Sequence, residues 1–372
     1  MMKLEEFAEI NMGQSPVSSS YNENEDGLPF FQGKADFGKI NPKAKVWCNK
    51  PTKIAEKDDI LMSVRAPVGD LNIATAKCCI GRGLAGIRAK KDKCYFKYLF
   101  YFLRSKYNEL NQMSTGSTFK AISKNNILNI EGNIPEIKEQ KIIVSKLDKI
   151  QDLIIKTEEQ IELLDDLIKS QFVEMFQSGN YPKEELGKLC DVRDGTHESP
   201  KYLEESRYKF ITSKNIINNE IDFSEVKYIS KQDYDKFNTR SKVNYGDILM
   251  PMIGTIGKPM IVNIPDDEID FAIKNVALIK FLGNSQVTNI YIKNLLDSDY
   301  FENAILQNKR GGTQKFIALS DIRKMQVEIP PIELQNQFAE IVKQIDKQKF
   351  EIQNELIELK KVKEYLMNKY FN

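Results

Sequence analysis

The chain has 372 residues, of which 41% are hydrophobic and 29% charged, and its formal net charge is +1. This composition is typical of a globular protein, and the length allows two domains. No stretch approaches the roughly 20 apolar residues of a membrane span. The N-terminus is amphipathic and acidic and has no signal-peptide core, so we expect a cytoplasmic protein without membrane contact.

The cysteines indicate the same compartment. There are five, an odd number, and none forms a Cys-x-x-Cys pair with the spacing of metal ligands. We therefore expect reduced, buried thiols and no metal site.

The first 130 residues are basic, with 20 Lys and Arg against 13 Asp and Glu. Residues 57–70 and 78–91 predict strands and turns, and residues 95–110 predict a helix that closes a first mixed domain. A glycine-containing loop follows, GSTFKAISKNNI at 116–127. The next run, ILNIEGNIP, predicts a strand that ends at a proline, where a helix can begin.

The segment from 131 to 180 is acidic, with 6 basic against 11 acidic residues, and it carries a 3-4 apolar spacing. This spacing predicts a helix of about 40 residues with a coiled-coil seam. The seam consists of Leu147, Ile150, Ile154, Thr157, Ile161, Leu164 and Ile168. A second seam near the C-terminus consists of Val342, Ile345, Ile352, Leu356, Leu359 and Leu366, interrupted by Lys349 and Lys363.

The two halves repeat one another. A shift of 195 residues, without gaps, aligns the loop at 116–127 with GGTQKFIALSDI at 311–322 and continues through both helices. Earlier segments also correspond, as in the shared Asp-Ile-Leu-Met at 59–62 and 247–250. We predict an α+β protein in which two similar mixed α/β domains are joined by two long antiparallel coiled-coil helices, with an internal pseudo-twofold repeat. The expected boundaries are 1–133 and 180–329 for the domains, and 134–179 and 330–372 for the helices.

As a set, these motifs resemble the specificity (S) subunit of type I restriction-modification systems. The resemblance rests on the two Gly-x-Thr-x-Lys loops, the two Ile-Pro helix openings, the helix ends FVEMF and MNKYF, and GTHESPKY at 195–202. It implies two target recognition domains that each read one half of a bipartite, asymmetric DNA site. It also implies that the helices set the spacing and bind two modification (methyltransferase) subunits, and that restriction subunits then join.

The resemblance further implies that this chain is not an enzyme and binds no cofactor. S-adenosylmethionine, ATP and Mg²⁺ are expected on the partner subunits. The sequence itself contains no N-P-P-Y or D-P-P-Y methyltransferase motif, no phosphate-binding G-x-x-x-x-G-K-[ST] loop and no dinucleotide fingerprint.

Polar residues in predicted loops are the candidates for DNA contact, because Gln and Arg can bond to base edges while Lys and backbone amides bind phosphates. In the first domain they are Gln14, Ser15, Tyr21, Gln32, Gly33, Lys34, Arg65, Arg82 and Gly83. In the second they are Thr196, His197, Lys201, Tyr202, Ser213, Lys214, Asn215, Lys258, Lys274 and Asn275. The repeated loops add Gly116, Thr118 and Lys120, and Arg310, Gly311, Thr313 and Lys315.

Each of these residues also has a structural interpretation: the arginines as surface ion pairs, His197 as a turn or cap residue, and the glycine loops as hinges. A second hypothesis for the whole chain is a duplicated protein–protein scaffold that does not read DNA. A stand-alone nuclease or methyltransferase would require clustered carboxylates or a cofactor loop, which the sequence does not offer.

Overall fold

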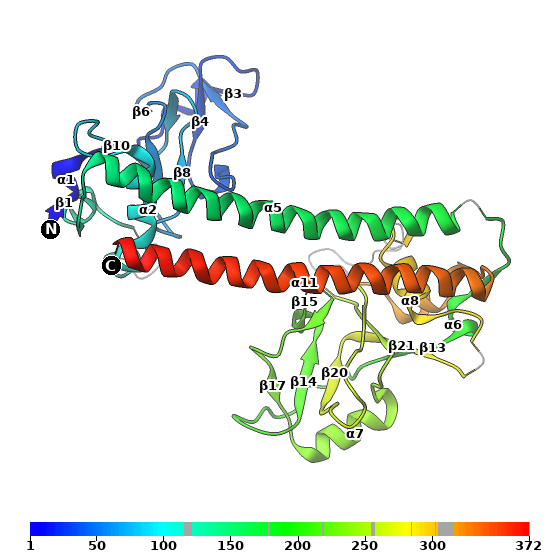
Figure 1. Cartoon of the computed structure of the whole chain (residues 1–372). Helices are drawn as coiled ribbons and strands as arrows, with labels where there is room; N and C mark the ends of the chain where they lie inside the picture. Colours follow the sequence, from blue (N-terminus) through cyan, green and yellow to red (C-terminus); the bar gives the residue numbers. More distant parts are fainter. Residues whose placement is uncertain are drawn as a thin grey trace. The chain divides into compact units, whose positions relative to one another are not determined.

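The computed structural model describes residues 1–114, 121–177, 179–217, 219–253, 257–283, 285–301, 303 and 316–371 (Figure 1). The chain divides into two compact units, Met1–Glu159 with Gln353–Asn372, and Gln160–Ile352. Each unit therefore contains one mixed domain and part of each long helix. Among the described residues, no helix is long and apolar enough to cross a membrane.

The first unit begins with a mixed domain of short strands and helices. Its strands are β1 Met2–Lys3, β2 Ala8–Met12, β3 Tyr21–Asn22, β4 Leu28–Phe31, β5 Trp47–Cys48, β6 Ile54–Ala55, β7 Ile60–Ser63, β8 Leu71–Ile73, β9 Cys78–Ile80, β10 Leu84–Ala89 and β11 Glu131–Gly132. Its helices are α1 Leu4–Phe7, η1 Ser18–Ser20, η2 Lys34–Asp36, α2 Phe96–Ser105, α3 Tyr107–Gln112 and α4 Lys124–Leu128.

Two larger sheets build this domain, in the orders β2-β10-β7-β8 and β3-β5-β4-β9-β6, and β1 pairs with β11 in a third. Strand β7 is buried along its whole length. Met62 faces the larger core with α2, and Leu61 faces a smaller cluster with Phe31 and Ile80. A strand between two cores reads as an uninterrupted apolar run, which explains the segment ILMS.

The second unit contains the matching domain. Its strands are β12 Lys183–Glu185, β13 Cys190–Asp194, β14 Lys209–Thr212, β15 Ile216–Ile217, β16 Glu220–Ile221, β17 Lys227–Tyr228, β18 Ile248–Pro251, β19 Met260–Ile261, β20 Phe271–Lys274, β21 Val276–Phe281 and β22 Gln326–Glu328. Its helices are α6 Leu186–Leu189, η3 Ser213–Asn215, α7 Lys231–Ser241, α8 Asn289–Leu296 and α10 Leu319–Arg323.

The two domains share much of their topology. The order β13-β21-β18-β19 repeats β2-β10-β7-β8, and β12-β22 repeats β1-β11. The parallel pair β14 and β20 likewise repeats the parallel pair β4 and β9. The predicted α+β class and internal repeat are therefore confirmed. The domains differ in their second sheet, which has the order β17-β14-β20 here, and in the separate pair β15-β16. They also differ in α7, an 11-residue helix between β17 and β18 for which the first domain has no described equivalent.

The long helices are α5, Ile137–Phe176, and α11, Ile332–Phe371, each of 40 residues as predicted (Figure 1). Their predicted seam residues are all buried or half-buried. Within the first unit the helices run antiparallel, since Lys146 bonds to Tyr370 and Glu158 pairs with Lys360. Within the second unit, Asp165 pairs with Lys349.

Both lysines that interrupt the predicted seam have a partner on the other helix. Lys349 bonds to Asp165, and Lys363 donates to the side-chain oxygen of Gln151. A polar pair at one seam position favours one register over the alternatives, because a slip would leave the lysine without its acceptor.

A buried glutamine joins each long helix to its own domain. The Oε1 atom of Gln140 accepts from the Tyr95 backbone N–H at 2.7 Å, while its Nε2 donates to the Lys93 and Pro135 carbonyls at 2.9 and 2.8 Å. The equivalent Gln335 accepts from Thr288 at 2.8 Å. It donates to the carbonyls of Gln286 at 3.0 Å and Pro330 at 2.9 Å. Both side chains are fully buried, so the same joint occurs in each half.

Two local predictions were wrong in detail. The expected helix over 95–110 breaks at Lys106, whose ψ of 9° leaves the α region, and continues as the separate helix α3. The run before Pro135 was predicted as one strand. It begins instead with α4, capped by the Ser123 side chain, and only Glu131 and Gly132 pair with β1. The cap outweighs the alternating apolar pattern in so short a segment. The cysteines are free and buried, as predicted.

Candidate nucleic-acid interface

The candidate residues of the first domain converge at one end of its sheets. The backbone N–H of Gln14 donates to Ile80, and the N–H of Gly81 donates to Phe31. The Arg82 N–H lies 3.3 Å from the Ser15 hydroxyl oxygen, and the carbonyl of Gly83 accepts from Val64. The segments 14–15, 32–33, 65 and 82–83 are thus neighbours, although up to 69 positions separate them in the sequence.

The two candidate glycines of this cluster have different roles. A Cβ atom on Gly83 would lie 2.3 Å from the carbonyl oxygen of Gln32, so only glycine permits this close approach of two loops. A Cβ atom on Gly33 would meet nothing within 4 Å. Gly83 therefore allows two loops of the cluster to pack closely, while nothing packs against Gly33 where a Cβ atom would lie.

The candidate side chains of the first domain fall into two groups. Gln14, Gln32, Arg65 and Arg82 are exposed. Tyr21 is directed inward instead, because its hydroxyl donates to the Pro16 carbonyl and its ring stacks on Phe30 at 4.7 Å.

Burial raises the pKa of the Tyr21 hydroxyl. Lys34, by contrast, is exposed and forms an ion pair with Asp70 at 2.9 Å.

The second domain repeats this loop geometry. The N–H of Gly195 donates to Val276 as that of Gly13 does to Leu84, and the N–H of Thr196 donates to Ile273. A Cβ atom on Gly195 would lie 2.3 Å from the Ile273 carbonyl oxygen. The loop that contains His197 therefore lies against the turn at Lys274 and Asn275.

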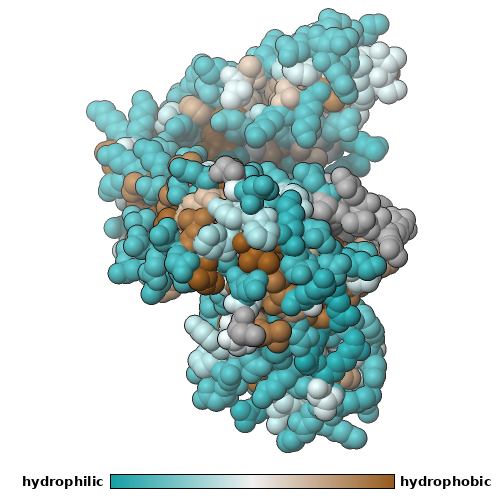
Figure 2. Space-filling model, turned by 90° about the vertical axis from the view of Figure 1, so that its right-hand side faces the viewer, coloured by the Kyte–Doolittle hydropathy of each residue, from teal (hydrophilic) through white to brown (hydrophobic). Residues whose placement is uncertain are grey.

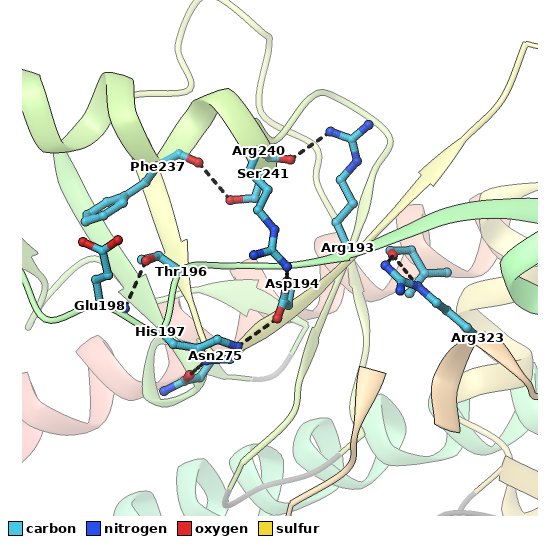
Figure 3. A network of polar contacts seen from close by, with 11 residues as sticks. Arg193, Asp194, Thr196, His197, Glu198, Phe237, Arg240, Ser241, Asn275 and Arg323 are labelled. Carbon is cyan, nitrogen blue, oxygen red and sulfur yellow. Dashed lines mark hydrogen bonds and ion pairs between the residues drawn. The ribbon is translucent and has the colours of Figure 1, made fainter. Parts of the chain in front are cut away.

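His197 is held by two polar neighbours (Figure 3). Its Nε2 lies 2.8 Å from the Asp194 carboxylate, and its Nδ1 lies 2.7 Å from the side-chain oxygen of Asn275. Asn275 has a left-handed backbone with φ of 54°, a conformation that asparagine tolerates better than most residues. The imidazole thus bridges the two loops while its ring remains exposed.

The other candidates of this domain differ in whether their polar groups already form hydrogen bonds within the protein. Asn215 is buried and bonds to the backbone of Thr212 and Asp222, so its amide has a structural use. The hydroxyl of Ser213 donates to the Asn275 carbonyl, and the Lys274 ammonium donates to Ser199.

Aromatic and basic side chains remain accessible. The Tyr202 ring packs against the ammonium of Lys227 at 4.1 Å. Lys201, Lys214 and Lys258 are exposed.

The repeated glycine loops lie outside the described residues. This applies to the candidates Gly116, Thr118, Lys120, Arg310, Gly311, Thr313 and Lys315. The residues that follow them are placed: Ala121 pairs with Arg65, and Phe316 pairs with Ile253. In each half, therefore, the first described residue after the glycine loop lies next to the loop that follows β7 or its equivalent β18.

Sequence reasoning missed the contribution of α7. Arg240, near the end of this helix, forms an ion pair with the same Asp194 that holds His197. The neighbouring Arg193 donates to the Arg240 carbonyl at 2.8 Å. No sequence motif marks these residues, because 47 positions separate the partners and α7 has no equivalent in the repeat.

Comparison with known proteins places the chain in a family. A family model described as the type I restriction modification DNA specificity domain matches residues 1–164 and again residues 180–361. The chain belongs to this specificity family. The two matches coincide with the two halves of the repeat, and the family agrees with the predicted resemblance.

Two relatives that are named as specificity subunits match different shares of this chain. A Methanocaldococcus jannaschii protein named as the MjaX specificity subunit is 48% identical over 161 residues, which is 42% of this chain and 38% of that protein. The type I restriction enzyme MjaVIII specificity subunit of the same organism is 22% identical over 99% of this chain and 91% of its own length.

A solved relative supports the fold over the full length. The crystal structure of the type I restriction-modification S subunit from M. genitalium covers 100% of this chain and 95% of its own, with a TM-score of 0.57 and 15% identity. The two proteins thus share their fold over the whole of this chain.

Proposed function

We propose that this protein gives a type I restriction-modification complex its DNA sequence specificity, and that each mixed domain reads one half of a bipartite, asymmetric site. The observation that carries the proposal is the repeated loop cluster. Equivalent backbone bonds at Gly13 and Gly195 build the same loop platform in each half, while the side chains on the two platforms differ. A shared scaffold with divergent exposed polar residues suits the recognition of two different base sequences.

The long helices are proposed to set the distance between half-sites and to bind two modification subunits. Exposed hydrophobic residues on their outer faces support this role. In the first unit they are Ile142, Leu153, Ile357, Val362 and Tyr365, and in the second Leu163, Leu167, Val173, Ile332 and Phe350. Figure 2 shows, for one face of the molecule, hydrophobic patches within a mostly hydrophilic surface. Such residues on both units suit one partner subunit per unit.

Catalysis is proposed to reside on the partners. The modification subunits would supply S-adenosylmethionine chemistry, and restriction subunits would add translocation and cleavage with ATP and Mg²⁺. This chain would act by positioning DNA, so its loop residues need hydrogen-bonding groups rather than nucleophiles.

Salt dependence of duplex binding tests DNA reading against the scaffold hypothesis. The full chain is co-purified with a modification subunit, and the affinity for duplex DNA is measured between about 50 and 200 mM salt. A DNA-reading complex should lose affinity steeply over this range, because each neutralised phosphate releases counterions. Neutral variants of exposed loop lysines, such as Lys201→Gln with Lys214→Gln, should reduce the slope. A complex that assembles but binds no duplex at any salt concentration would favour the scaffold.

A further inference from the structure

A nearly buried carboxylate organises two exposed side chains at the recognition loops of the second domain (Figure 3). One oxygen of Asp194 pairs with the guanidinium of Arg240, and the other lies 2.8 Å from Nε2 of His197. The Asp194 side chain is 10% exposed, whereas those of Arg240 and His197 are 67% and 64% exposed. The Asp194 carboxylate thus orients two exposed side chains, Arg240 and His197.

The backbone beneath Arg240 is fixed as well. Arg193 donates to the Arg240 carbonyl and is itself paired with Asp191. The next residue, Ser241, is buried and its hydroxyl bonds to the Phe237 carbonyl. Holding both the main chain and the guanidinium reduces the rotamer freedom that arginine would otherwise lose on binding a ligand.

The ion pair makes base recognition a better use of Arg240 than phosphate binding. Asp194 neutralises much of the arginine charge, which weakens its attraction to a phosphate backbone. Within the described part of the chain, Asp194 is the partner of the guanidinium, so the remaining N–H groups can donate elsewhere. A planar fork in a fixed orientation suits the bidentate acceptors of a guanine edge, which a freely rotating side chain would match only part of the time.

We propose that Arg240 reads a guanine in the half-site bound by the second domain, and that Asp194 is its positioning residue. This inference rests on the proposed function. It assigns a recognition role to α7, the helix that distinguishes the second domain from the first. The exposed arginines of the first domain, Arg65 and Arg82, have no ion-pair partner among the described residues, so the device belongs to one half of the protein.

The test measures which DNA sequences are methylated. The full chain is co-expressed with its modification subunit, and methylated positions are mapped for the native protein and for Arg240→Gln, Arg240→Lys and Asp194→Asn. Rates are then measured on duplexes substituted one base pair at a time. The native protein should yield one bipartite motif. Arg240→Gln should relax one G·C position in one half-site by roughly 10- to 100-fold, with the other half unchanged.

The remaining variants separate base reading from other roles. Arg240→Lys should relax the same position, since an ammonium lacks the planar fork. Asp194→Asn should partly relax specificity at this position. The double variant Asp194→Asn with Arg240→Gln should relax specificity no more than Arg240→Gln alone. Lys231→Gln, on the first turn of α7 and 68% exposed, is the matched control and should leave the motif intact. Thermal unfolding of each variant reports any loss of structure.

Two results would overturn the inference while leaving the proposed function intact. Arg240→Gln could slow methylation equally for all sequences, which would make Arg240 a phosphate contact, or it could change nothing. If the native protein produced no bipartite motif in an assembled, active complex, the proposed function itself would be refuted.

Discussion

Replacing either buried glutamine at the helix joints should destabilise the protein by a similar amount. Gln140→Met and Gln335→Met keep the side-chain volume and remove three hydrogen bonds each, all between 2.7 and 3.0 Å. In each variant one backbone N–H and two carbonyls lose a fully buried partner, although one of the carbonyls belongs to an exposed residue, Lys93 or Gln286. An unpaired buried group costs about 1–3 kcal/mol, and a carbonyl that can reach water costs less, so we expect about 2–4 kcal/mol per variant.

Guanidinium unfolding followed by circular dichroism measures this cost. Gln160→Met, at an exposed position on α5, is the control and should change stability by less than about 0.5 kcal/mol. The two buried sites should agree within about 1 kcal/mol, because their bonding partners are equivalent. A cost below about 1 kcal/mol at both sites would show that the glutamines do not fix the helices to their domains. A large cost at one site alone would contradict the equivalence of the halves.

Two further predictions concern the helix seam and the first recognition cluster. Desolvation lowers the pKa of Lys363 to about 8, below the value of about 10.4 for free lysine. The folded state therefore binds fewer protons than the unfolded state between these values, and the native protein should gain stability relative to Lys363→Met as the pH rises from about 8 to about 10. We expect Lys363→Met to be more stable than the native protein at pH 7 by about 1–2 kcal/mol, after allowing for solvent screening. A stability difference that does not change with pH would refute the lowered pKa of Lys363. At the first cluster, Gly83→Ala should cost about 1–3 kcal/mol and weaken recognition of one half-site, because its Cβ would meet the Gln32 carbonyl. Gly33→Ala, with open space at its Cβ, should be nearly neutral in unfolding and methylation assays, and equal effects of the two alanines would count against the loop packing.

Much of the architecture can be predicted from the sequence because the two halves of the chain repeat one another. The seam residues, the Asp-Ile-Leu-Met strands and the Ile-Pro helix openings each occur in both halves, so a repeat alignment identifies them without other information. Gln140 and Gln335 were visible as an aligned pair, but their burial depends on contacts with segments about 45 residues upstream.

The candidate site was harder to predict than the fold. Loop glycines such as Gly83 and Gly195 mark places where two backbones approach, and this signal is present in the sequence. The direction of a side chain is not. Asn215 and Tyr21 have the polar groups of DNA-contacting residues but use them within the protein. Arg240 was missed because α7 lacks a repeat partner and its acid lies on a distant strand.

The most direct test of the account exchanges one recognition domain. Residues 1–133 are replaced by the corresponding domain of another family member, and methylated sites are mapped in cells that also express the modification subunit. If each domain reads one half-site, one half of a bipartite motif changes while the other half and the spacer between them remain. A stable, active complex in which both halves change, or in which no bipartite motif appears, would contradict it.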